Sequence, residues 1–113
     1  MHTIQLHDFE QTSPDGFTKR MIRETPHALV FMLNFEAGQT LPAHTHGESD
    51  VLLTVLAGEG EVTVDGRAER VRPGLAVHCE GKESLSARNT GTAPLSLLVF
   101  LYPGQARFAG NVR

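Results

Sequence analysis

The stretch GQTLPAHTHGESDVLLTVLAGEG, residues 38–60, joins a polar bend to an apolar strand. His44 and His46 are one residue apart, so on a strand both side chains project from one face and can aim two imidazoles at one point. Asp50 follows beyond a bend at Gly47, at the start of the apolar run. Two imidazoles and one carboxylate on a rigid wall form a facial triad, which suits non-haem iron(II) and leaves coordination positions open.

Short segments rich in apolar and β-branched residues lie on both sides of this stretch and predict strands. Asp65-Gly66 is a strong signal for a hairpin turn between two short alternating strands. The predicted strands lie at 28–36, from 41 onward, at 50–58, on either side of Asp65-Gly66, at 75–80, and on either side of the turn at 89–94. Seven or eight short strands at spacings of about 8 to 12 residues are typical of an all-β sandwich or barrel.

The composition is that of one ordinary globular domain. The chain has 113 residues, 40% of them apolar and 20% charged. Its net charge of -3 favours neither a nucleic-acid nor a membrane partner. The start lacks the blocks of a signal peptide, so we expect a cytoplasmic protein. We expect one domain over 1–113, with the core motifs in 28–103 and looser ends at 1–15 and 104–113.

Two stretches of the chain carry a family resemblance. Gly38, five residues, His-x-His, three residues, an acid and an apolar strand ending at Gly58 resemble the first conserved motif of the cupin superfamily. The family's usual acid is glutamate, and Asp50 is a shorter substitute. GRAERVRPGLAVHCEGKESLSARNTG, residues 66–91, resembles the second motif. The resemblance implies a small single-domain cupin with a double-stranded β-helix, or jelly-roll barrel.

The resemblance also implies a metal site. His44, His46 and Asp50 would hold a divalent ion, while Leu85 stands where the family normally has its last ligating histidine and would line the pocket. Imidazole and carboxylate ligands permit iron, manganese, nickel, copper or zinc, and the sequence does not choose among them. Glu48 is the alternative acid because it shares the same nominal strand parity. The alternative to a metal site is a polar strand end with both histidines in water.

The remaining histidines and the single cysteine have structural interpretations. Alternation directs His78 out of the barrel, opposite Cys79, which we expect to be buried. One cysteine cannot form a disulfide within the chain. The other histidines, His2, His7 and His27, are expected at the surface.

Two functions follow from these expectations. The first is a metal-dependent enzyme of dioxygenase or isomerase type that acts on a small organic molecule. The second is a binding or sensing module with a degenerate or absent metal site, which Leu85 favours because an apolar wall suits an organic ligand. The resemblance implies a homodimer in both cases. Segment 94–102 is apolar on both faces, which either the chain itself or a partner could cover.

Overall fold

The structure is a computed structural model that describes residues 1–104, and this part contains nine β-strands and one short 3-10 helix, η1 (Leu6–Phe9). The strands are β1 (Thr18–Thr25), β2 (Ala28–Phe35), β3 (Thr40–His44), β4 (Ser49–Ala57), β5 (Gly60–Val64), β6 (Arg67–Val71), β7 (Ala76–Cys79), β8 (Leu85–Asn89) and β9 (Leu95–Pro103). Every strand pair is antiparallel. The predicted all-β class is confirmed.

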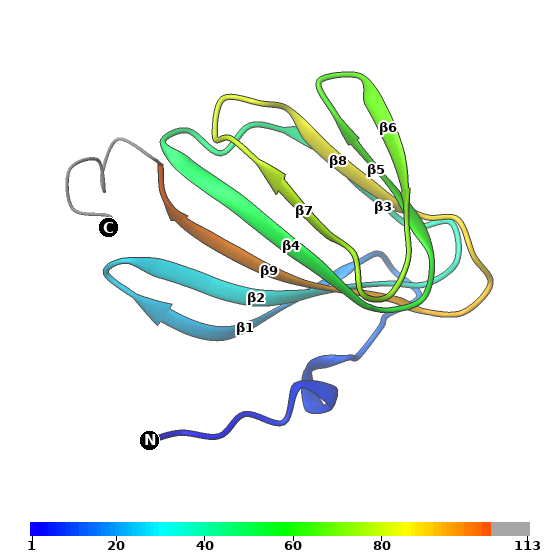
Figure 1. Ribbon diagram of the computed structural model, residues 1–113. Helices are drawn as coiled ribbons and strands as arrows, with labels where there is room; N and C mark the ends of the chain where they lie inside the picture. The colour runs from blue at the N-terminus through cyan, green and yellow to red at the C-terminus, as the bar shows by residue number, and fades with distance from the viewer. Residues whose placement is uncertain (105–113) are drawn as a thin grey trace.

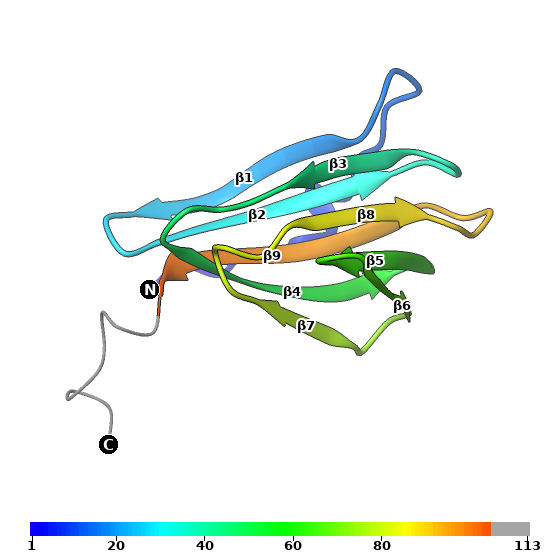
Figure 2. The same ribbon diagram turned by 90° about the horizontal axis from the view of Figure 1, so that it is seen from above.

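The strands form two sheets, one in the order β1-β2-β9-β4-β7 and one in the order β3-β8-β5-β6. In Figure 1, β2, β9 and β4 lie side by side in the larger sheet, and Figure 2 shows that the strand axes of the two sheets are roughly aligned. Neighbours far apart in sequence, such as β2 and β9, are characteristic of the predicted jelly-roll barrel, which is confirmed. No helix in residues 1–104 is long and apolar enough to cross a membrane.

Alternation along the central strands places one face of each sheet in a shared apolar core. In β4, Val51, Leu53 and Val55 are buried, whereas Leu52 between them is 36% exposed. The central strands of the larger sheet supply most of this core, and β5, β6 and β8 of the smaller sheet close it from the other side. The core therefore lies between the two sheets.

The segment before β1 covers part of the outer face of the larger sheet. Asn34 and Ser96 are buried on that face, and the Ser96 hydroxyl donates a hydrogen bond to Asn34 Oδ1 at 2.8 Å. The Asn34 side-chain amide donates to the Phe9 carbonyl at 2.7 Å. These contacts hold the residues around η1 against the sheet. The looser start predicted for 1–15 stays a prediction, and the predicted loose end lies, from residue 105 on, outside the described residues.

Strand β1 was not predicted from the sequence. Its residues, TKRMIRET, carry charges on both faces, so they lack the apolar alternation by which a strand is recognised. The structure explains this pattern, because β1 is an edge strand that pairs only with β2. Edge strands commonly carry charged side chains, which discourage pairing with other chains.

Gly58, between β4 and β5, touches the backbone of the turn before β9. Its φ is +81°, and a Cβ atom built on it would collide with the Pro94 carbonyl oxygen and lie 2.8 Å from Leu95 Cα. Gly66 in the β5–β6 hairpin has the same φ, with Asp65 beside it at φ +48°, but a Cβ there would meet nothing within 4 Å. The first glycine is therefore needed for space and conformation, and the second for conformation alone.

Candidate ligand pocket

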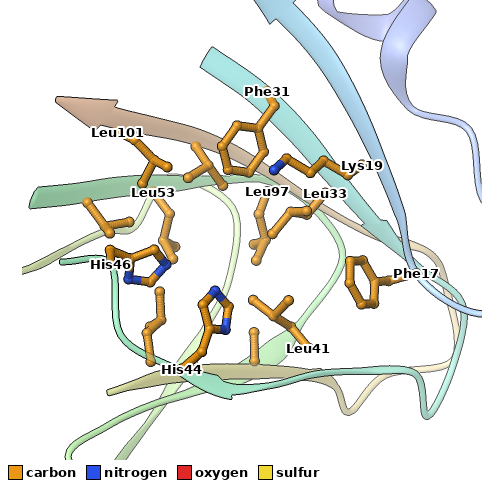
Figure 3. Close-up of a pocket in the computed structure, with 14 residues that line it drawn as sticks. Phe17, Lys19, Phe31, Leu33, Leu41, His44, His46, Leu53, Leu97 and Leu101 are labelled. Carbon is orange, nitrogen blue, oxygen red and sulfur yellow. The ribbon is translucent and has the colours of Figure 1, made fainter. Parts of the chain in front are cut away.

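A cavity of about 280 Å³ lies between the two sheets, and we call it the inter-sheet pocket. Fourteen residues line it, of which eleven are apolar. The three polar ones are Lys19, His44 and His46, and Figure 3 shows both imidazole rings directed toward the cavity. Lys19 and His44 are exposed, so these side chains lie where the pocket meets the solvent. The pocket thus has an apolar body and a polar margin.

The two histidines of the HTH sequence form a close pair. Their ring centroids are 4.6 Å apart, with the ring planes inclined by 52°. His44 Nδ1 lies 2.9 Å from the carbonyl oxygen of Pro42, which can only accept a hydrogen bond. Nδ1 of His44 therefore carries the proton, and in the neutral ring the lone pair is on Nε2. Both rings line the pocket, and His44 is at the same time exposed to solvent at its margin.

His46 is the more enclosed member of the pair. Burial lowers the pKa of its imidazole, and the neighbouring His44 and Lys19 lower it further. Its Nδ1 is buried and has no hydrogen-bond partner in the described chain. An N–H without a partner is the costlier state of a buried nitrogen, so we assign the proton of the neutral ring to Nε2. His46 therefore offers a hydrogen-bond donor on Nε2.

Leu85 lies directly across from the histidine pair. Its backbone is the partner of His44 in the β3–β8 ladder, and its buried side chain lines the pocket. The strand register thus places an apolar group next to the two imidazoles, at the position where the family resemblance implies a histidine.

Asp50, the third predicted ligand, does not line the pocket. Alternation along β4 puts its neighbour Val51 in the pocket wall and the Asp50 carboxylate on the opposite face. There, Asp50 Oδ1 accepts a hydrogen bond from the Gly81 N–H at 3.3 Å, and Oδ2 lies 3.5 Å from His78 Nε2. The structure therefore brings together two of the three predicted ligands and directs the third toward His78.

The side chains around the pocket do not fit a three-ligand metal centre. Glu48, the alternative acid, is exposed and does not line the pocket. Within residues 1–104, no three His, Cys, Asp or Glu side chains come together in a way that could hold a metal ion. The metal site on His44, His46 and Asp50 stays a prediction, for which this arrangement supplies two imidazole donors.

Replacing Asp50 with asparagine tests the contacts that its carboxylate makes. Asparagine keeps an acceptor for the Gly81 N–H but loses the charge beside His78, so we expect the free energy of unfolding to fall by about 1 kcal/mol. Urea denaturation at neutral pH would measure this change. Glu48→Gln removes an exposed carboxylate nearby and serves as the control, with no loss expected. Equal stability of the two variants would contradict a stabilising role for the Asp50 carboxylate.

The remaining histidines and the cysteine lie where the sequence predicted them, His78 and Cys79 by alternation and the others as surface residues. The side chain of His78 is 51% exposed, and His2, His7 and His27 are exposed. Cys79 is buried, and burial together with nearby carboxylates, Glu83 first among them, raises the pKa of its thiol to about 11. Such a thiol stays protonated at neutral pH and is a poor nucleophile.

Lys19 is a pocket residue that the sequence did not reveal. It lies on β1, where its backbone partner is Leu33 of β2, another pocket residue. Because the sequence does not predict β1, Lys19 falls in what looks like a polar opening of the chain. Its spacing of two residues from Phe17, which also lines the pocket, was the available signal.

The jelly-roll topology and the paired histidines on and just after β3 fit the cupin resemblance of the sequence, and comparison with known proteins agrees. A family model described as Cupin domain matches residues 31–101, so the chain belongs to the cupin family. No protein of curated function matches the sequence.

Solved structures similar to this chain have the same fold. Protein TT1209 of Thermus thermophilus is 25% identical, with a TM-score of 0.86 over 92% of this chain and 99% of that one. An RmlC-like cupin from Desulfovibrio desulfuricans is 24% identical, with a TM-score of 0.82 over 92% and 98%. A predicted oxalate decarboxylase from Thermotoga maritima is 18% identical, with a TM-score of 0.65 over 82% and 98%. One of these structural relatives is thus described as an enzyme.

Proposed function

We propose that this cupin is a small-molecule-binding protein that encloses the apolar part of its ligand in the inter-sheet pocket. The observation that carries the proposal is the composition of the pocket wall: eleven apolar side chains and, at the margin, two histidines and a lysine. Binding pockets for small molecules are commonly apolar cavities with a few polar groups that orient the ligand. A volume of about 280 Å³ suits a ligand smaller than a typical drug.

The histidine pair supplies the orienting contacts in this proposal. With its proton on Nε2, His46 donates a hydrogen bond, while Nε2 of His44 accepts one when that ring is neutral and donates one when it is protonated. An oxygen function at the end of an apolar body would accept from His46, and it would accept from both rings when His44 is protonated. The apolar wall keeps water from the body of the ligand, while the polar contacts lie at the margin of the pocket.

Metal-dependent catalysis of dioxygenase or isomerase type is the other function the family allows. It would need a third protein ligand to complete a facial triad with His44 and His46. Asp50 contacts Gly81 and His78, and Leu85 presents only carbon, so the donor set favours binding without a metal. If a divalent ion were held by the two imidazoles, its chemistry would be polarisation of an oxygen-bearing ligand.

Filling the pocket tests the proposed function. Ala87 lines the cavity from β8 and is buried, so Ala87→Phe would occupy much of the space that a ligand needs. We expect that small aromatic and aliphatic fragments, screened by protein-observed NMR, shift resonances of pocket residues in the wild type and lose at least 10-fold in affinity for the variant. Ala93→Phe, at an exposed turn, is the control. Fragments that bind elsewhere, or equally well to Ala87→Phe, would contradict the proposal.

We also propose that the protein is a homodimer formed through the outer face of the larger sheet. Leu52 and Phe100 are direct partners in the β4–β9 ladder, and each is 36% exposed on that face. Adjacent exposed apolar side chains on a sheet favour burial against a partner. This exposure supports cover of segment 94–102 by a partner subunit.

Light scattering at micromolar concentration should therefore give about twice the 12.3 kDa chain mass. Leu52→Lys combined with Phe100→Lys should give the chain mass, because two lysines per copy would face one another across the interface. Met21→Lys is the control, since Met21 is 44% exposed but pairs with Phe31 and so lies on the pocket face of the sheet. A wild-type mass of 12.3 kDa would contradict the proposed dimer.

A further inference from the structure

We infer that the inter-sheet pocket selects small organic anions carrying a single negative charge, such as an apolar monocarboxylate, and that Lys19 is the residue that sets this preference. The inference rests on the proposed function and names the class of ligand. It is drawn from the charges that border the pocket and from the position of the lysine.

The pocket wall contains basic groups and no acidic one. Lys19, His44 and His46 are the polar side chains among its fourteen residues. Asp50, which precedes the pocket residue Val51 on β4, has its carboxylate on the opposite face of the sheet. A ligand that enters the pocket therefore meets one lysine ammonium group and two imidazoles, without a carboxylate to offset them. This arrangement attracts an anion and repels a cation.

Lys19 is positioned by the pocket and not by a surface ion pair. Its Nζ lies over the ring of Phe31, 4.5 Å from the ring centroid, and Phe31 is itself a pocket residue. Among the salt bridges within residues 1–104, none involves Lys19. The ammonium group is therefore available to a ligand, and the aromatic ring keeps it at the pocket margin.

The apolar wall limits the charge that a ligand can bring. Eleven of the fourteen lining residues offer no polar side-chain atom, so a charged group is stable only at the margin where Lys19 and the histidines lie. One ammonium group balances one negative charge. A second carboxylate at the other end of the ligand would be buried among leucines and valines without a partner. The pocket thus suits an apolar body with one anionic end.

A pair of nearly isosteric probes separates charge from shape. Naphthalene-2-carboxylate and naphthalene-2-carboxamide have the same ring system and differ in whether the end group is charged. Calorimetric titration of the wild type at neutral pH and low salt should give a dissociation constant at least fivefold lower for the carboxylate than for the carboxamide. Lys19→Met keeps much of the side-chain length without the charge, and it should bring the two constants within a factor of two, chiefly by raising the constant for the carboxylate.

Two further variants complete the test. Lys19→Arg keeps the charge and should retain the preference for the carboxylate. Lys82→Met removes a lysine that is exposed and paired with Glu80, outside the pocket, and should leave both constants as in the wild type. This control makes the same change in net charge as Lys19→Met.

The possible results distinguish the inference from the proposed function. Equal binding of both probes by the wild type, or a carboxylate preference that survives Lys19→Met, would overturn the inference and leave the pocket as a binding site. Binding of neither probe to the wild type would overturn both. Preference for the carboxylate in the wild type and Lys19→Arg, lost in Lys19→Met, would support both.

Discussion

Gly58→Ala is expected to lower the free energy of unfolding by roughly 3 kcal/mol or more, a large share of the stability of a domain of this size. The added methyl group would collide with the Pro94 carbonyl oxygen and lie 2.8 Å from Leu95 Cα, and these backbone atoms have no rotamer through which to move away. The φ of +81° adds a conformational cost for any residue other than glycine. Urea denaturation followed by circular dichroism would measure the loss.

Gly66→Ala is the matched control for this experiment. Gly66 has the same φ of +81°, and a Cβ atom there meets nothing within 4 Å. Its replacement should cost only the conformational part, about 1 kcal/mol. The difference between the two variants then reports the close approach of the β4–β5 connection to the turn before β9. Equal losses would show that this approach contributes nothing.

Leu85→His is expected to create a metal site. Leu85 is the direct backbone partner of His44, so a third imidazole would enter the pocket wall beside a pair whose ring centroids are 4.6 Å apart. Three imidazoles form a donor set that binds zinc or nickel tightly, whereas two bind weakly. We expect the affinity for nickel(II), measured by calorimetry, to rise at least 100-fold over the wild type.

The same substitution in a chain that also carries His44→Ala and His46→Ala is the control. It adds the imidazole without its two partners, so the gain in nickel affinity should disappear. Nickel binding that persists in this triple variant would locate the ion elsewhere. Wild-type affinity equal to that of Leu85→His would show that the native chain already has a third ligand, and would restore Asp50 or Glu48 as the candidate.

The strands of the core were predictable because their side chains alternate between the apolar interior and the outer face. The segment around Val62 carries that alternation, the segments around Val51 and Leu97 are recognisable as dense apolar runs, and the Asp65-Gly66 turn marked one hairpin. Strand β1 carries no such pattern because it is an edge strand with charges on both faces. Because β1 was not predicted, Lys19 was not recognised as a pocket residue, and the positive charge at the pocket was missed.

The side-chain direction of Asp50 could not be predicted, because it depends on a bend whose geometry the sequence does not specify. His44 and His46 share a strand parity, but the turn at 46–49, closed by the Ser49 N–H bond to the His46 carbonyl, resets the parity for β4. The pairing of β4 with β7 then brings the Asp50 carboxylate near His78. Local spacing therefore predicted the histidine pair, while the position of the acid required the register between strands distant in sequence.

The single buried thiol can report on the transient opening of the strands around it. Cys79 lies on β7 opposite Val51, and its protonated, enclosed sulfur reacts with thiol reagents only when the strands around it separate. Any compound that binds the closed barrel makes such separation rarer, by mass action, and so slows the labelling. The rate of modification at this one sulfur thus allows ligands of any chemistry to be found without a dye or a tag.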